Sequence, residues 1–174
     1  MWLPEYTRRD RQTLQNVYCL RQYRAKVVMT QSAPLLPAEL DKMVQRFKRA
    51  SEPKRRYEQL LWLAQKLEPF PDAGKVEANK VSGCVSQVYV TASLEDGKML
   101  YCGDSDAQLT KGLLAFLIKG LSGTSPDRIV GLTPDFIQDT GLAVSLTPSR
   151  ANGFHNIFKK MQALALALSN ECKA

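Results

Sequence analysis

Cys84 is the residue with the best local setting for sulfur chemistry. It stands in Val81-Ser82-Gly83-Cys84-Val85-Ser86-Gln87-Val88, between two segments that we expect to be extended. Gly83 permits a tight turn, which would put the cysteine at a loop tip with its sulfur open to approach. Val81 and Val85 are placed to shelter a nucleophilic sulfur, which needs both thiolate character and access. A buried structural cysteine is the ordinary alternative, and position alone leaves the two interpretations equal.

Arg150 is the second candidate for a functional role. In Thr147-Pro148-Ser149-Arg150 it falls in the first turn of the last expected helix, where the helix dipole disfavours a cation. An arginine placed against that preference suits a chemical task, either lowering the pKa of the Cys84 thiol or binding a carboxylate of a partner. A surface arginine that packs its aliphatic stem is the alternative.

The other candidates have ordinary structural explanations. Asp104 and Asp106 follow a strand and favour helix capping, and Asp106 is also placed to brace the loop that holds Cys84. His155 is expected to be structural or exposed. Cys102 is expected to be a packed small hydrophobe, with a second sulfur relay as the alternative.

Helices are expected on both sides of a β-hairpin. Apolar residues from Leu40 to Phe47 recur at helical spacing, and a second helix is expected to be capped by Ser51 with Pro53 in its first turn. Lys54-Arg55-Arg56 at its start is interpreted as a solvated basic face. The apolar stripe of this second helix comprises Tyr57, Leu60, Leu61, Ala64 and Leu67.

The hairpin is indicated by alternation and by a turn signal. Residues 85–94 and 98–102 read as strands, joined at Glu95-Asp96-Gly97-Lys98, where glycine supplies the positive φ. A buried helix follows from Gly103 and ends at Ser122-Gly123.

Three serine or threonine residues followed by proline then start helices. They are Ser125-Pro126, Thr133-Pro134 and Thr147-Pro148, the last of which begins the C-terminal helix. Helices, a small antiparallel β-sheet and helices again predict an α+β fold in a single domain.

Composition limits the classes of protein. The 174 residues, 44% hydrophobic and 24% charged, are typical of one globular domain, and the longest apolar run, residues 113–118, is too short to cross a bilayer. Residues 1–28 hold six Lys or Arg and two acids, so they contribute +4 of the net charge of +7. The remaining +3 on residues 29–174 argues against nucleic-acid binding by the domain.

Cysteine and histidine usage points to free thiols. Four scattered cysteines without a CxxC pair make a disulfide framework an unfavoured interpretation. The single histidine argues against a mononuclear Cys/His zinc site. Cys19 and Cys172 are interpreted as incidental.

The chain is expected to divide near residue 35. Residues 1–35 are interpreted as a flexible or misassigned extension, because Met29 opens a plausible second beginning, and residues 36–174 as the folded domain. A transit peptide is the alternative for the first 28 residues, which are rich in arginine and poor in acids.

Three motifs carry a resemblance to a known family. They are residues 81–88 around Cys84, Gly103-Asp104-Ser105-Asp106-Ala107, and Leu146-Thr147-Pro148-Ser149-Arg150-Ala151-Asn152-Gly153. Their order and spacing, and the helical pair before the cysteine, resemble the SufE/CsdE family of sulfur acceptors over about residues 36–168. Tyr89 departs from the tryptophan that family members often have there, and the leader has no counterpart in the family core.

The resemblance implies a SufE/IscU-like fold and a specific function. Such proteins stimulate a pyridoxal-phosphate cysteine desulfurase of the SufS/CsdA type by accepting its sulfane sulfur as a persulfide. They pass that sulfur to a SufB-containing iron–sulfur scaffold, and they are carriers rather than enzymes. By motif match the acceptor is Cys84, with Arg150, Asp106 and Gly83 in support. No cofactor is expected on this chain, because the pyridoxal phosphate stays on the desulfurase.

The resemblance also implies a setting. We expect a monomer or weak dimer in the bacterial cytoplasm, with the plastid stroma as the alternative compartment, and neither nucleic acid nor membrane as a partner. Two other functions compete with this interpretation. An IscU-type cluster scaffold would need about three or four convergent soft ligands, and only Cys84 and Cys102 lie in the core. A cysteine-nucleophile enzyme would need a base near its thiol, and the one histidine lies on another helix.

Overall fold

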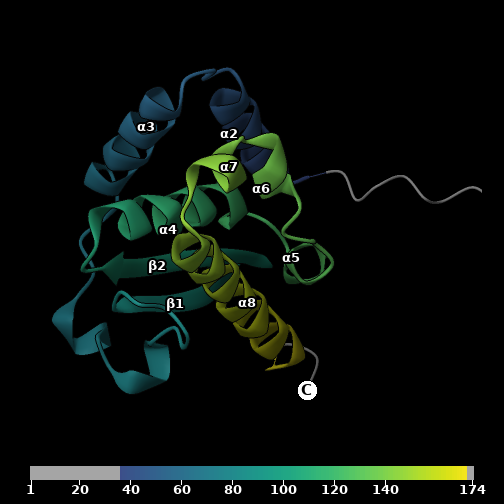
Figure 1. The fold of residues 1–174 in the computed structure, drawn as a ribbon. Coiled ribbons are helices and arrows are strands. Elements are labelled where there is room, and N and C mark those ends of the chain that lie inside the picture. The colour runs from purple at the N-terminus through teal and green to yellow at the C-terminus, as the bar shows by residue number, and fades with distance from the viewer. Residues whose placement is uncertain (1–35, 172–174) are drawn as a thin grey trace, which may run out of the picture. The chain divides into compact units, whose positions relative to one another are not determined.

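A β-hairpin with helices packed on one of its faces is the frame of the fold (Figure 1). The computed structural model of the protein describes residues 36–171. The hairpin consists of β1 (Val88–Glu95) and β2 (Lys98–Ser105), which pair antiparallel from Val88 opposite Ser105 to Glu95 opposite Lys98. This small antiparallel sheet among helices confirms the predicted α+β class.

The turn between the strands has the predicted position. Asp96 has a φ of 49° and Gly97 a φ of 72°, so both central residues adopt left-handed backbone conformations. Such a turn matches the right-handed twist of the two strands and therefore favours a tight hairpin.

Alternation along the strands decides which face is covered. Val88, Val90 and Met99 are fully buried, because their side chains point toward the helical layer. Helix α4 (Gln108–Leu121) packs against β2, and α8 (Pro148–Glu171) packs against β1. The two helices thus form the layer against which residues near the end of the hairpin pack.

The N-terminal helical pair covers α4 from its other side. Helices α2 (Ala38–Lys48) and α3 (Pro53–Gln65) both pack against α4 (Figure 1). Phe47 and Phe116 meet edge to face with ring centroids 5.3 Å apart. This apolar contact fixes α2 on α4 and extends the core away from the sheet.

Short helices and turns complete the described residues. They are the 3₁₀ turns η1 (Asp72–Gly74) and η2 (Glu77–Asn79), and the helices α5 (Pro126–Val130), α6 (Phe136–Asp139) and α7 (Leu142–Ser145). In the part of the chain from 36 to 171, no helix is long and apolar enough to cross a membrane.

Two details of α3 correct the sequence analysis. Glu52, not Ser51, precedes the helix, and no side chain caps it. The buried stripe includes Leu63 and leaves Leu61 39% exposed. Positions 60, 63 and 64 share the face that meets α4, whereas position 61 lies one residue beyond that face.

Arg56 is also placed differently from the prediction of a solvated basic face. Its guanidinium donates hydrogen bonds to the carbonyl oxygen of Gly141 at 3.3 Å and to Oγ of Ser145 at 3.4 Å. Arg56 therefore ties α3 to α7, a contact between segments far apart in the sequence.

Strand β2 continues three residues beyond its predicted end. Residues 103–105 pair with Val88 to Val90, and α4 begins only at Gln108 after Ala107. Asp104 and Asp106 therefore do not cap a helix, contrary to prediction. Cys102 is exposed rather than packed, because it alternates with the buried Tyr101 on the strand.

The proline-marked helix starts were partly right. Helices α5 and α8 begin at Pro126 and Pro148 as predicted. After Thr133-Pro134 the helix starts only at Phe136, with Asp135 before it, and α7 was not predicted. Four-residue helices carry too few periodic positions to be recognised from a pattern.

Candidate functional site

Cys84 lies in a loop that leaves the sheet and returns to it. The backbone N–H of Val81 donates to the carbonyl oxygen of Val88 at 2.8 Å, which closes the base of the loop. Gly83 turns the chain with a φ of 74°, a conformation that side chains beyond glycine rarely adopt. The closed base and the glycine turn together determine the position of Cys84 in the loop, directly after the turn.

The sulfur of Cys84 is half-buried against α8. Its Sγ lies 3.7 Å from the carbonyl oxygen of Gly153, and the side chain packs against the core. Burial raises the pKa of the Cys84 thiol, because a thiolate would lose hydration there. The position of the sulfur therefore favours the neutral thiol over the thiolate.

A cavity of about 470 Å³ opens beside the sulfur. It lies between the first turn of α4 and the first turn of α8. Its lining consists of Cys84, Val85, Ser86, Ala107, Gln108, Leu109, Thr110, Thr147, Ser149, Arg150 and Gly153. The positive ends of two helix dipoles lie at the cavity, so it is better suited to an anion than to a cation.

Arg150 and Val85 both line this cavity and are exposed. Arg150 is the cationic residue of the lining. The predicted lowering of the Cys84 pKa by Arg150 is not the direction found in the resting loop, where burial raises it. Val85 was expected to shelter the sulfur, but it is 91% exposed at the cavity, whereas Val81 is buried.

Two side chains from other elements hold the return arm of the loop. The backbone N–H of Gln87 donates to Oδ1 of Asp106 at 3.0 Å, and the N–H of Asp106 donates to the Gln87 carbonyl oxygen at 3.2 Å. The hydroxyls of Ser86 and Thr110 lie 3.3 Å apart. Asp106 thus contacts the Cys84 loop, as expected, through reciprocal bonds to one residue.

Asp104 has a different structural role from Asp106. Its carboxylate pairs with Lys111 at 2.7 Å and with Lys75 at 3.3 Å, joining β2 to α4 and to the η1 turn. Burial would raise the pKa of Asp104, but the bonds from Lys111 and the Ser105 backbone outweigh it and the pKa is lowered. Asp104 is therefore an ionised brace of the fold.

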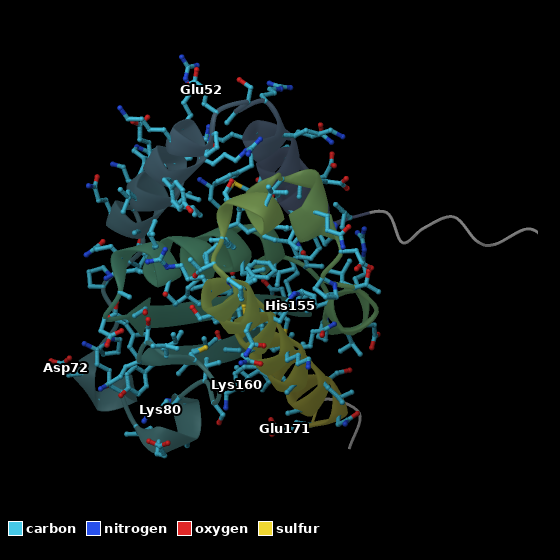
Figure 2. The ribbon with its side chains drawn as sticks, viewed as in Figure 1. Glu52, Asp72, Lys80, His155, Lys160 and Glu171 are labelled. Carbon is cyan, nitrogen blue, oxygen red and sulfur yellow. The ribbon has the colours of Figure 1, made fainter. Side chains whose placement is uncertain are left out.

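Two residues of α8 that the sequence analysis did not single out hold the entering arm. Nδ2 of Asn156 donates to the carbonyl oxygen of Gly83 at 2.9 Å, and Nζ of Lys160 donates to that of Ala78 at 2.9 Å. Figure 2 shows Lys160 on α8 near the segment that carries Lys80. Their helical spacing from Gly153 was the signal in the sequence, because 153, 156 and 160 share one face.

The remaining predicted candidates lie apart from this chemistry. His155 is half-buried and its ring meets that of Phe154, with centroids 5.9 Å apart. Cys19, Cys172 and the extension over residues 1–35 lie outside the described residues. From 36 to 171, no three His, Cys, Asp or Glu side chains gather as a metal-binding group.

Comparison with known families gives one match over most of the chain. Residues 41–165 match the Fe-S metabolism associated domain, SufE. The chain belongs to the SufE family. Its role therefore lies in Fe–S metabolism, and the predicted family resemblance is confirmed.

Relatives of this SufE-family chain come from bacteria, plants and protozoa. A SufE-like protein of Synechocystis sp. is 67% identical over 132 residues, covering 76% of this chain and 83% of the relative. SufE-like protein 1, chloroplastic/mitochondrial, of Arabidopsis thaliana is 48% identical, covering 76% of this chain and 36% of the relative. The cysteine desulfuration protein SufE of Plasmodium vivax is 40% identical, covering 76% and 55%. The chain thus spans only part of these two longer relatives.

A solved structure shows the same fold. The solution structure of a hypothetical protein from Thermus thermophilus superposes with a TM-score of 0.69 at 28% identity. The match covers 78% of this SufE-family chain and 99% of that protein. The helical layer on a small antiparallel sheet is therefore a shared architecture.

Proposed function

We propose that this SufE-family protein carries sulfur as a persulfide on Cys84. It takes the sulfur from a cysteine desulfurase of the SufS/CsdA type, stimulates that enzyme, and passes the sulfur to a SufB-containing Fe–S scaffold. The observation that carries the proposal is the position of Cys84, half-buried beside a cavity formed by the first turns of α4 and α8. The name of the Plasmodium relative, a cysteine desulfuration protein, supports the donor.

The proposed step is a thiol exchange. The Cys84 thiolate attacks the outer sulfur of the donor cysteine persulfide, a new S–S bond forms on Cys84, and the donor cysteine leaves as a thiolate. The sulfane sulfur moves with its oxidation level unchanged, so no outside oxidant or reductant is consumed. The protein acts as a carrier, and the pyridoxal phosphate belongs to the desulfurase, so no cofactor is proposed for this chain.

The cavity supports this chemistry through its size and its polarity. Its volume of about 470 Å³ exceeds what one added sulfur atom needs. The first turns of two helices and the exposed Arg150 favour a negative charge there. A persulfide anion on Cys84 would therefore be stabilised more in the cavity than against the Gly153 carbonyl oxygen, which attracts a thiol proton but repels an anion.

The proposal also includes a docking surface, an oligomeric state and a compartment. The docking surface that we propose is the exposed lip of the cavity, which Val85 and Arg150 form. We propose a monomer or weak dimer that works in the bacterial cytoplasm, with the plastid stroma as the alternative. The name of the Arabidopsis relative, SufE-like protein 1, chloroplastic/mitochondrial, supports the plastid alternative.

Sulfur loading tests the proposal directly. The protein is incubated with a SufS-type desulfurase, pyridoxal phosphate and cysteine, and intact-mass spectrometry without reductant follows. We expect the wild type to gain one or more sulfur atoms and Cys84→Ser to gain none. Cys102→Ser is the matched control, since Cys102 is exposed and outside the cavity lining, and it should load like the wild type. Equal loading of Cys84→Ser, or no loading of the wild type with several desulfurases, would overturn the proposal.

A further inference from the structure

Asn156 lies directly over the turn that presents Cys84. Its Nδ2 atom donates to the Gly83 carbonyl oxygen at 2.9 Å. A Cβ atom at position 83 would lie 2.7 Å from the same nitrogen, so the amide also contacts the face of the turn. The turn and the amide are therefore fitted to each other by contact as well as by a hydrogen bond.

The same face of α8 contacts the sulfur itself. Gly153 lies three positions before Asn156, and its carbonyl oxygen is 3.7 Å from Sγ of Cys84. Residues three apart in a helix are surface neighbours. One helix face thus holds both Cys84 and the residue before it, and a movement of the turn away from α8 would break both contacts together.

We propose that Asn156 is a positioning residue for Cys84, whose amide holds the Gly83–Cys84 turn on α8 in the half-buried state and releases it when the sulfur is to react. The use of this release for sulfur transfer rests on the proposed function, but the positioning itself does not. The Val81–Val88 backbone bond closes the base of the loop, and Asp106 holds the return arm through Gln87, so the movement is confined to the Gly83–Cys84 turn.

The chemistry of the asparagine side chain suits a releasable contact. The Gly83 carbonyl oxygen needs a donor, which the neutral amide supplies and a carboxylate cannot. A neutral hydrogen bond near solvent contributes little net free energy, so the contacts that a docking partner makes are sufficient to break it. Asn156 is placed to keep the sulfur covered without locking it.

The rate of alkylation at Cys84 tests this role without any partner protein. The full chain carries Cys19→Ser, Cys102→Ser and Cys172→Ser, so that iodoacetamide reports on Cys84. We expect Asn156→Leu, a neutral variant of similar shape without the donor, to react roughly threefold to tenfold faster, as loss of one hydrogen bond predicts. Asn156→Ala should react at least as fast.

The pH profile of that rate separates positioning from a general loss of structure. Burial raises the pKa of Cys84, so release should move the midpoint of the profile toward lower pH. Arg150 is the charged residue among the described side chains that line the cavity, and it is unchanged in all variants. Asn152→Ala, an exposed asparagine of the same helix, is the matched control and should keep both rate and midpoint.

Two results decide the inference. A faster rate and a lower midpoint in Asn156→Leu, with circular dichroism and melting temperature close to those of the parent, establish the positioning role. Rates and midpoints equal to those of Asn152→Ala overturn it. Failure of sulfur loading by a desulfurase would remove the persulfide function and leave this result intact, so the two proposals fail separately.

Discussion

The sulfur of Cys84 and the carbonyl oxygen of Gly153 lie 3.7 Å apart, so the second turn of α8 forms a wall of the sulfur site. A Cβ atom at Gly153 would lie 3.8 Å from the same sulfur, at ordinary van der Waals contact. Gly153 is buried and helical, and its lack of a side chain leaves room beside the sulfur.

Gly153→Ala should therefore stabilise the fold and slow the chemistry. Alanine in a helix interior gains roughly 0.5–1 kcal/mol over glycine, and the new methyl group should slow alkylation of Cys84 by crowding its approach. Thermal unfolding and the iodoacetamide rate measure the two effects. Asn152→Ala, which also gains helix propensity but lies on the exposed side, should leave the rate alone. An unchanged rate in Gly153→Ala would show that this wall does not restrict the sulfur.

Gly83→Ala should destabilise the protein more than Gly97→Ala. Both glycines have a φ above 70°. A Cβ atom at position 83 would lie 2.7 Å from the Asn156 side chain, whereas a Cβ atom at position 97 would have no atom within 4 Å. The shared backbone strain costs about 1 kcal/mol in each variant, and the contact adds to it only at position 83. Urea unfolding of both variants, and of Gly83→Ala combined with Asn156→Ala, measures the difference. The double variant should recover the excess.

Asp106→Ala should loosen the return arm of the Cys84 loop. The variant removes the acceptor for the Gln87 N–H, at a cost of about 1 kcal/mol in stability, and should raise the alkylation rate of Cys84. Asp106→Asn keeps an oxygen acceptor of the same shape and should lie close to the parent. Asp139→Ala, an exposed aspartate of α6, controls for loss of a negative charge. If Asp139→Ala matched Asp106→Ala, the effect would be one of charge alone.

Arg150→Ala should lower the rate of sulfur loading while leaving stability within about 0.5 kcal/mol, as for other exposed residues. Its cation lines the cavity at the first turn of α8, and under the proposed function it would favour the anionic form of the persulfide there. Arg150→Lys keeps the charge without the planar guanidinium group, so its loading rate should lie between those of the wild type and Arg150→Ala. Lys159→Ala removes an exposed cation elsewhere on α8 and should load normally. Single-turnover loading followed by mass spectrometry gives these rates.

Tyr101 should make stability fall at alkaline pH. Its hydroxyl donates to the Met161 carbonyl oxygen at 2.9 Å, and burial raises its pKa. A phenol whose pKa is higher in the folded state contributes stability below its unfolded pKa and loses it as pH rises beyond about 10. Tyr101→Phe should cost about 1 kcal/mol below that range and lose less stability above it. Melting curves in a Cys84→Ser background test this, with Tyr89→Phe as the control for loss of an exposed hydroxyl.

Sequence patterns predicted the structural features that depend on residues close together in the chain. The hairpin turn at Asp96 and Gly97, the buried face of β1 and the start of α8 at Pro148 all follow from local spacing and capping. The glycine turn before Cys84 was predicted for the same reason. These elements bring the cysteine and the first turn of α8 to one end of the fold.

What depends on distant packing was not predictable. Arg56 is half-buried because Gly141 and Ser145 lie against it, although 85 and 89 positions separate them in sequence. Strand β2 extends to Ser105 because Val88 pairs with it, which moved Asp104 and Asp106 off the expected helix. The contact of Asn156 with Gly83 likewise joins positions 73 residues apart.

The exposed side chain of Val85 couples recognition to chemistry. Water covers 91% of this valine in the free protein, at the lip of the cavity that holds the sulfur. Its complete burial by a partner would release roughly 1.5–3 kcal/mol, which corresponds to about a tenfold to hundredfold gain in affinity. That gain is available only to a surface seated over the thiol. A protein that binds elsewhere on the domain gains no affinity from Val85. The exposed valine therefore favours partners that bind over the sulfur.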